Sequence, residues 1–225
     1  MDAIFFKPHV GEKYGEGFNG KKILILGHSY PCNEKIGEMC PGCGVTPKNE
    51  NCKEATIQSI EEYQKDVLKS ANAKTFRNFE IALAGHVDSQ IWNNVIFYNY
   101  AQRAFVKREP AQDPNGEVIR TGRCSKECYR FSAPIFVEVL KAYRPEYIIV
   151  WGEATHDEVI ENMKNIKKIK GITVDNLNYK LDDSDVVCER LHIDTDYGVK
   201  ILRMHHPSLG YNADYWRKVL ISFFE

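Results

Sequence analysis

The sequence predicts an α/β protein whose core is a short sheet of four parallel strands. Four apolar runs of strand length each lead into a polar or glycine-started loop, as expected for strands that are covered on both faces. Segments with apolar residues at helical spacing separate these runs, which is typical of parallel strands joined by crossover helices. The four runs are residues 23–27, 95–99, 147–151 and 199–204.

Helical periodicity is clearest in segments that place their apolar residues on one stripe. The predicted helices are residues 54–70, 75–83, 132–143, 155–168 and 212–224. Thr155 and Glu158 have the spacing of a capping box, which predicts that the fourth helix begins there. Residues 186–193 alternate weakly and precede a turn, so we expect an edge strand in a hairpin with the last strand.

Length and composition are those of one α/β domain, residues 1–225, with a small insert at about residues 32–52. A net charge of −1 gives no overall basic field, so binding to nucleic acid would need a local patch. The N-terminus lacks the pattern of a secretion signal, and no stretch approaches the roughly 18 apolar residues of a membrane span. We therefore expect a cytoplasmic monomer without a membrane partner.

Polar residues stand directly after the predicted strands. Because the carboxyl ends of parallel strands share one edge of a sheet, these side chains should converge where α/β proteins bind their ligands. They are His28, Ser29, Asn99, Glu153 and His206. Two histidines in a loop that ends in Pro207 are difficult to explain as core packing, whereas an asparagine in such a place could simply bond the backbone.

Four of the seven cysteines stand close together, at Cys32, Cys40, Cys43 and Cys52. The inner Cys-Pro-Gly-Cys pair allows two sulfurs to face one metal, and four thiolates suit Zn²⁺ or, less well, an iron–sulfur cluster. The alternative is a set of reduced thiols with an incidental CxxC. Cys124 and Cys128 could contribute ligands instead, but they are weaker candidates because they have no partner pair.

Several motifs in order resemble those of the uracil-DNA glycosylase superfamily. They are LILGHSYP at the first strand, VIFYNY at the second, YRPEYIIVWG at the third and His-Pro-Ser after the last. The resemblance covers residues 21–225 and implies a three-layer α/β/α sandwich around a short, central, four-stranded parallel sheet. It also implies an active site at the carboxyl edge of that sheet.

The resemblance assigns roles to single residues. His206 would hydrogen-bond O2 of the leaving base, where an imidazole stabilises developing negative charge. Asn99 would read the base edge, because an amide offers a donor and an acceptor together. Ser208 lies in the loop expected to contact the DNA backbone and base. An aromatic ring should stack under the base, and Tyr30, Phe76 and Phe79 are the candidates.

The first motif departs from the family pattern because Gly27-His28-Ser29 has no carboxylate to orient the attacking water. His28 or Ser29 would have to take this role. The sequence therefore predicts a glycosylase-like hydrolase that cleaves the N-glycosidic bond of uracil or a related damaged base in single- or double-stranded DNA. The alternatives are a non-catalytic nucleic-acid or nucleotide-binding module with the same pocket and a hydrolase of small nucleosides or nucleotides.

Overall fold

The structure is a computed structural model. It describes residues 6–29, 31–32, 53–65, 73–102, 105–106, 111–112, 118–119, 126–166, 172–181, 184–208 and 210–225. Cys40, Cys43, Cys52 and Tyr30 lie outside the described residues, as does the side chain of Cys32.

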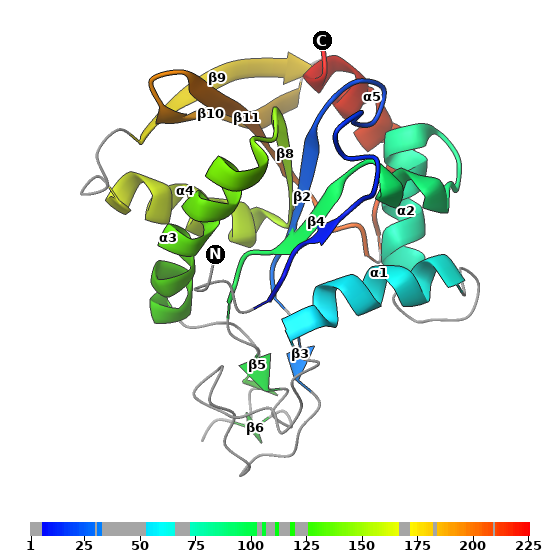
Figure 1. The fold of residues 1–225 in the computed structure, drawn as a ribbon, viewed down its shortest axis with the longest axis horizontal. Helices are drawn as coiled ribbons and strands as arrows, with labels where there is room; N and C mark the ends of the chain where they lie inside the picture. The colour runs from blue at the N-terminus through cyan, green and yellow to red at the C-terminus, as the bar shows by residue number, and fades with distance from the viewer. Residues whose placement is uncertain are drawn as a thin grey trace.

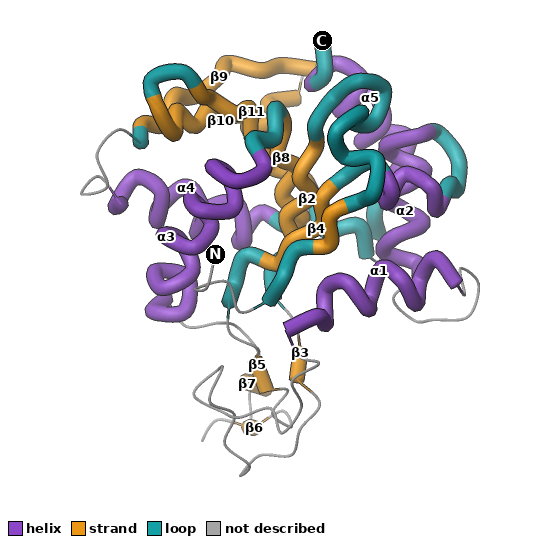
Figure 2. Tube along the Cα trace, in the orientation of Figure 1, coloured by secondary structure: helices purple, strands orange, loops and turns teal. Residues whose placement is uncertain are grey.

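A mixed sheet forms the centre of the fold (Figures 1 and 2). Within the described residues its strands pair in the order β1-β4-β2-β8-β11-β10-β9. The strands are β1 His9–Val10, β2 Ile23–Gly27, β4 Ile96–Asn99, β8 Tyr147–Trp151, β9 Thr173–Leu181, β10 Ser184–Asp194 and β11 Tyr197–Met204. The neighbours β4, β2, β8 and β11 are parallel, which confirms the predicted parallel core.

The predicted four-stranded sheet is too small, because antiparallel strands extend both of its edges. β1 pairs with β4 on one side, and the β9–β10 hairpin continues from β11 on the other. β1 has two residues, too few to show alternation, and β9 is largely polar. β10 does form the expected hairpin with β11, but it is an inner strand, because β9 covers its other side.

Helices lie on both faces of the sheet (Figure 1). The helices are α1 Ala55–Lys65, α2 Ala73–Ala84, α3 Lys126–Tyr143, α4 Glu153–Asn165 and α5 Ala213–Phe223, with a 3-10 helix, η2, at Ser89–Asn93. α3 and α4 pack on one face through one apolar cluster, and α1, α2 and α5 pack on the other through a second cluster. No described helix combines the length and apolar character that crossing a membrane requires.

The starts of α3 and α4 differ from the prediction in informative ways. α3 begins six residues before Ser132, and Pro134 lies inside it. The N-cap of α4 is Gly152, at a φ of 100° and without a capping side chain, so the predicted capping box at Thr155 is wrong. Glycine is suited to this position because its φ lies in the region that residues with a Cβ disfavour. The chain therefore turns from β8 into α4 within one residue.

Short strand pairs follow the central strands. β3 at Pro31–Cys32 pairs in parallel with β5 at Phe105–Val106, and β6 at Ala111–Gln112 pairs with β7 at Val118–Ile119. β3 and β5 lie below the sheet in Figure 1, on the side to which β2 and β4 lead. This side is the carboxyl edge of the parallel strands.

Candidate active site

An open cavity of about 750 Å³ lies at the carboxyl edge of the parallel strands. The loop after β2, the start of α4, the loop after β11 and one turn of α3 contribute to it. The described residues that line it are His28, Ser29, Tyr129, Trp151, Gly152, Glu153, Ala154, Thr155, His205 and His206. The edge predicted from sequence thus brings His28, Ser29, Glu153 and His206 around one cavity.

Both ring nitrogens of His28 are hydrogen-bonded. Its Nδ1 lies 2.6 Å from the Ser29 hydroxyl oxygen, and its Nε2 bonds the hydroxyl of Tyr129, which is buried in α3. A neutral imidazole has one donor and one acceptor, so these two hydroxyls use both. The contacts fix the orientation of the ring and join the loop after β2 to α3.

His206 also lines the cavity, at the start of the loop after β11. Its ring meets the Trp151 ring edge-on, with the centroids 6.0 Å apart. Part of the ring is open to the cavity, yet the concave, partly aromatic surroundings lower the pKa of His206 by desolvation. Burial favours the uncharged imidazole. His206 is therefore a neutral hydrogen-bonding group at neutral pH.

Asn78 of α2 holds the loop that carries His206. Its side-chain amide donates to the carbonyl oxygen of Pro207 at 3.1 Å and to that of Ser208 at 3.4 Å. The Ser208 amide also donates to the His206 carbonyl at 2.7 Å, which makes a tight turn. Ser208 is half-buried and is not among the described residues that line the cavity.

Asn99 is buried beside Gly27, its register partner on β2. A Cβ at Gly27 would overlap the side-chain oxygen of Asn99, so glycine is what allows the amide to lie across the end of β2. The Asn99 amide nitrogen lies 3.5 Å from the Thr56 hydroxyl of α1. Asn99 is on the sheet face of α1 and α2, and it is not among the described residues that line the cavity.

Phe79 contributes to the core. It is fully buried in α2, and its ring centroid is 5.1 Å from that of Trp151. A ring without exposed surface offers no face to a base in this conformation. Trp151, at the end of β8, is the aromatic residue of this cluster that lines the cavity.

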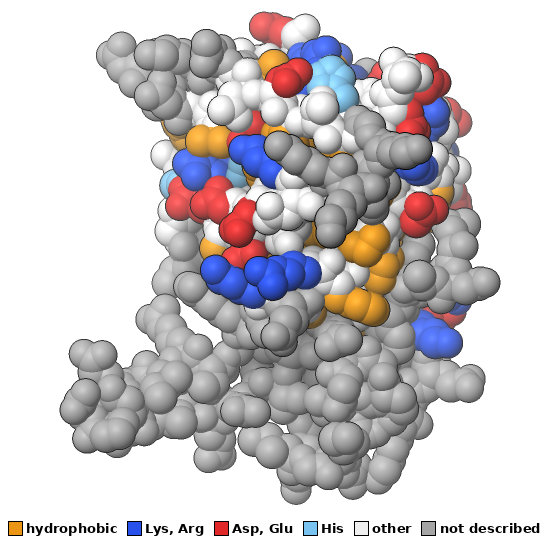
Figure 3. Space-filling view, turned by 90° about the vertical axis from the view of Figure 1, so that its left-hand side faces the viewer, with side chains coloured by type: hydrophobic (Ala, Val, Ile, Leu, Met, Phe, Trp, Pro, Cys, Tyr) orange, Lys and Arg blue, Asp and Glu red, His pale blue; other side chains and the backbone are white. Residues whose placement is uncertain are grey.

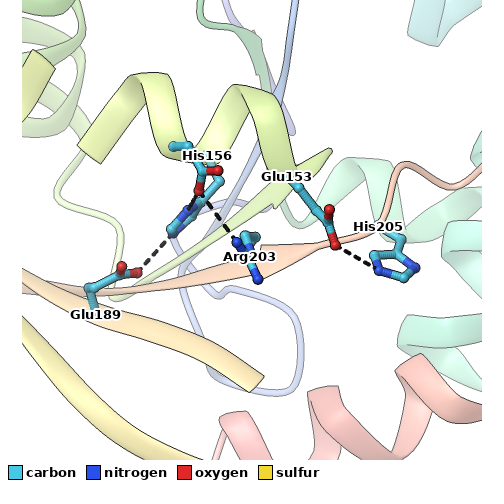
Figure 4. A network of polar contacts seen from close by, with 6 residues as sticks. Glu153, His156, Glu189, Arg203 and His205 are labelled. Carbon is cyan, nitrogen blue, oxygen red and sulfur yellow. Dashed lines mark hydrogen bonds and ion pairs between the residues drawn. The ribbon is translucent and has the colours of Figure 1, made fainter. Parts of the chain in front are cut away.

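A carboxylate and a second histidine complete the wall. Glu153 is the first residue of α4, and its Oε1 lies 2.9 Å from Nε2 of His205 (Figure 4). The two side chains are 54% and 64% exposed, so the pair is accessible from the cavity side. β8 and β11 are adjacent and parallel, with Trp151 opposite Met204, which places the residues that follow them side by side.

A polar network whose His156–Glu189 contact is buried anchors α4 beside this pair (Figure 4). His156 is 1% exposed, and its Nε2 lies 2.8 Å from the Glu189 carboxylate of β10. Its Nδ1 faces Asp157 at 3.2 Å, and Asp157 also pairs with Arg203 of β11 at 3.5 Å. Because these contacts join the first turn of α4 to two strands, they fix the direction in which the turn presents Glu153.

Comparison of the sequence with protein-family models and with curated proteins finds no match. The resemblance to uracil-DNA glycosylases therefore rests on the order of the four motifs.

Sequence reasoning did not single out Tyr129 or Trp151 as site residues, and it noted His205 only as one of the two histidines before Pro207 without giving it a role. Trp151 ends a predicted strand and His205 follows another, so position after a strand was the available signal for both. Tyr129 precedes the predicted start of its helix, and only the three-dimensional structure brings it to His28. No cluster of metal-ligand type is found among the described residues.

Charge on the protein surface is mixed. On the face drawn in Figure 3, acidic and basic side chains of the coloured residues lie interspersed. This agrees with the formal net charge of −1. Contacts with a DNA backbone on this face would come from single side chains rather than from a broad basic field.

Proposed function

We propose that the protein hydrolyses the N-glycosidic bond of uracil or a related damaged base in DNA. The observation that carries this proposal is the position of His206. It stands at the carboxyl edge of the parallel strands, in one cavity with His28 and Ser29, where desolvation by the surrounding cavity lowers its pKa and favours the neutral imidazole.

The reaction needs a group that stabilises the departing base. When the bond between C1′ and the base nitrogen breaks, its electron pair stays on the base, and water adds to C1′ of the positively charged sugar. A neutral imidazole that donates a hydrogen bond to the base oxygen stabilises this negative charge more in the transition state than in the substrate. His206 would supply this bond.

The rest of the site would hold the flipped nucleotide. Trp151 lies edge-on beside His206 at the cavity lining with 3% of its surface exposed, so stacking on a base would require its ring to be uncovered as the base enters. Asn99 would read the base edge, as the motif resemblance implies, which requires its buried amide to become accessible when the base enters. Flipping costs a few kcal/mol, and contacts from the loop around Ser208 would offset it.

A base-release assay tests the proposal. Single- and double-stranded oligonucleotides with uracil, hypoxanthine or no lesion are incubated with the protein, and alkali-labile breaks are counted. We expect breaks at one lesion, a loss of about 10²-fold or more in His206→Ala, and no loss in His192→Ala. His192 is a suitable control because it pairs with Asp175 on the β9–β10 hairpin, outside the cavity lining.

The alternatives give different results. Folded protein that binds these oligonucleotides but breaks none would be a non-catalytic binding module. Release of base from free nucleosides, with none from DNA, would indicate a small-molecule hydrolase. Equal rates for wild type and His206→Ala would contradict the role given to His206.

A further inference from the structure

The loop after β2 has no carboxylate, but the cavity is also lined by Glu153, which follows the neighbouring strand β8. Glu153 comes directly after Gly152, whose positive φ turns the chain from β8 into α4. Its carboxylate lines the cavity together with His28 and His206. A group that was expected from one strand is thus present at the end of a neighbouring strand.

His28 is poorly placed to accept a proton from water. Its Nδ1 and Nε2 already bond the hydroxyls of Ser29 and Tyr129. Taking a proton from water would require one of these bonds to break, and the ring is held on both sides. The geometry suits His28 better for orienting the Ser29 hydroxyl than for acting as a base.

Glu153 has an oxygen available. His205 bonds Oε1, whereas Oε2 has no hydrogen-bond partner among the residues that the structure describes. A carboxylate held through one oxygen keeps the other as an acceptor in a fixed direction. The N-terminus of α4 also stabilises negative charge at this position through the helix dipole.

We propose that Glu153 is the catalytic carboxylate of this site and that His205 is its positioning residue. The inference rests on the proposed function. Oε2 of Glu153 accepts a proton from the attacking water as the water oxygen bonds C1′, and the electron pair of the broken bond leaves with the base. The carboxylate then returns the proton to solvent, and the base takes up a proton from water. No further reactant is needed.

Glu153 and His206 together meet the two electrostatic demands of such a reaction, one on the sugar and one on the base. The negative charge of Glu153 stabilises the positive charge that develops on the sugar, and His206 stabilises the negative charge on the base. His205 lies edge-on to Trp216 of α5, with ring centroids 5.3 Å apart, which restrains the imidazole from behind. The buried contact of His156 with Glu189 and the more exposed ion pair of Asp157 with Arg203 hold the start of α4.

The test compares variants of the full chain in the base-release assay under single-turnover conditions. Glu153→Gln keeps the size and one acceptor oxygen of the side chain but cannot take the proton. We expect it to release base about 10²- to 10⁴-fold more slowly, with little change in DNA affinity. Glu161→Gln is the matched control, an exposed carboxylate on the same helix whose loss should leave the rate unchanged.

His205 needs a readout that a structural role alone would not change. His205→Ala should slow base release by about 10-fold or more and change the pH dependence of the rate, because the carboxylate loses its fixed partner. His205→Gln retains an N–H donor and should recover most of the rate. Thermal unfolding of each variant, compared with that of Glu161→Gln, shows whether the fold is intact. Glu153→Asp tests whether a shorter carboxylate keeps part of the base-release rate that Glu153→Gln loses.

The outcomes separate this inference from the function on which it depends. Base release that requires His206 but persists in Glu153→Gln would overturn the role of Glu153 and leave the proposed function standing. Base release that is lost in Glu153→Gln and unchanged in Glu161→Gln would support it. Absence of base release by the wild type on every lesion would overturn both.

Discussion

Replacement of Gly27 by alanine should disturb the end of β2 and displace Asn99. The new methyl group would overlap the Asn99 side-chain oxygen and would lie 3.3 Å from Cζ of Phe97. Both neighbours are buried, at 7% and 5% exposure. The amide must therefore rotate or the strands must separate slightly, since there is no open space beside them.

The expected cost is that of overpacking a filled core, about 1–3 kcal/mol of unfolding free energy. For a chain of this size, each 1 kcal/mol lowers the melting temperature by roughly 2–4 °C. Urea unfolding followed by circular dichroism measures this loss. Gly15→Ala is the control, because a Cβ at Gly15 meets nothing within 4 Å; its unfolding free energy should stay within about 0.5 kcal/mol of wild type.

A double variant identifies the cause. If the Asn99 amide is the group that clashes, Gly27→Ala combined with Asn99→Ala should be more stable than the sum of the two single changes predicts. A coupling of about 0.5–3 kcal/mol is typical of residues in contact. A Gly27→Ala protein as stable as Gly15→Ala, or a coupling of zero, would refute this account of the two residues.

Three further predictions follow from buried groups. Glu189→Ala should lower the free energy of unfolding by about 1–3 kcal/mol, because His156 loses a buried partner. Asp175→Asn removes a charge from the exposed pair with His192 and should change the free energy by about 1 kcal/mol or less. Equal effects of the two variants in urea unfolding would contradict the structure. Burial lowers the pKa of His9, so as pH falls through about 6.5 the unfolded chain binds this proton before the folded protein does. The free energy of unfolding should therefore fall between about pH 7 and 5, and it should fall less steeply in His9→Gln than in wild type. Identical slopes would show that His9 does not cause this pH dependence. Burial also raises the pKa of the Cys188 thiol to about 12. Iodoacetamide at neutral pH should therefore label this thiol only after the protein unfolds, and mass spectrometry measures the labelling. Equal labelling rates in native and unfolded protein would contradict the burial of Cys188.

The parallel core could be predicted because its signals are local. The runs that became β2, β4 and β8 are short and continuously apolar, whereas β11 alternates buried and more exposed residues, and a polar or glycine residue ends or follows each run. β9 could not be predicted in the same way. Its polar sequence is held in the sheet by pairing with β10, which is a tertiary contact and leaves little trace in periodicity.

The site shows the same limit. Position after a strand was enough to bring His28, Glu153 and His206 together. Position after a strand could not show which way a side chain points. In the structure Asn99 lies against Gly27 and Thr56, and Phe79 is enclosed in the core. Side-chain direction depends on the alternation of the strand or helix and on the packing around it, and the motif order specifies neither.

The most direct test of the account is to locate the base in the cavity. An oligonucleotide with 2′-fluoro-deoxyuridine, whose fluorine slows formation of the sugar cation, is titrated into protein with isotope-labelled histidines. We predict that the ring signals of His206 shift on binding, that those of His192 stay in place, and that thymidine at the same position gives no such shift. Binding that moves His192, or that leaves His206 unchanged, would contradict an active site at the carboxyl edge of the sheet.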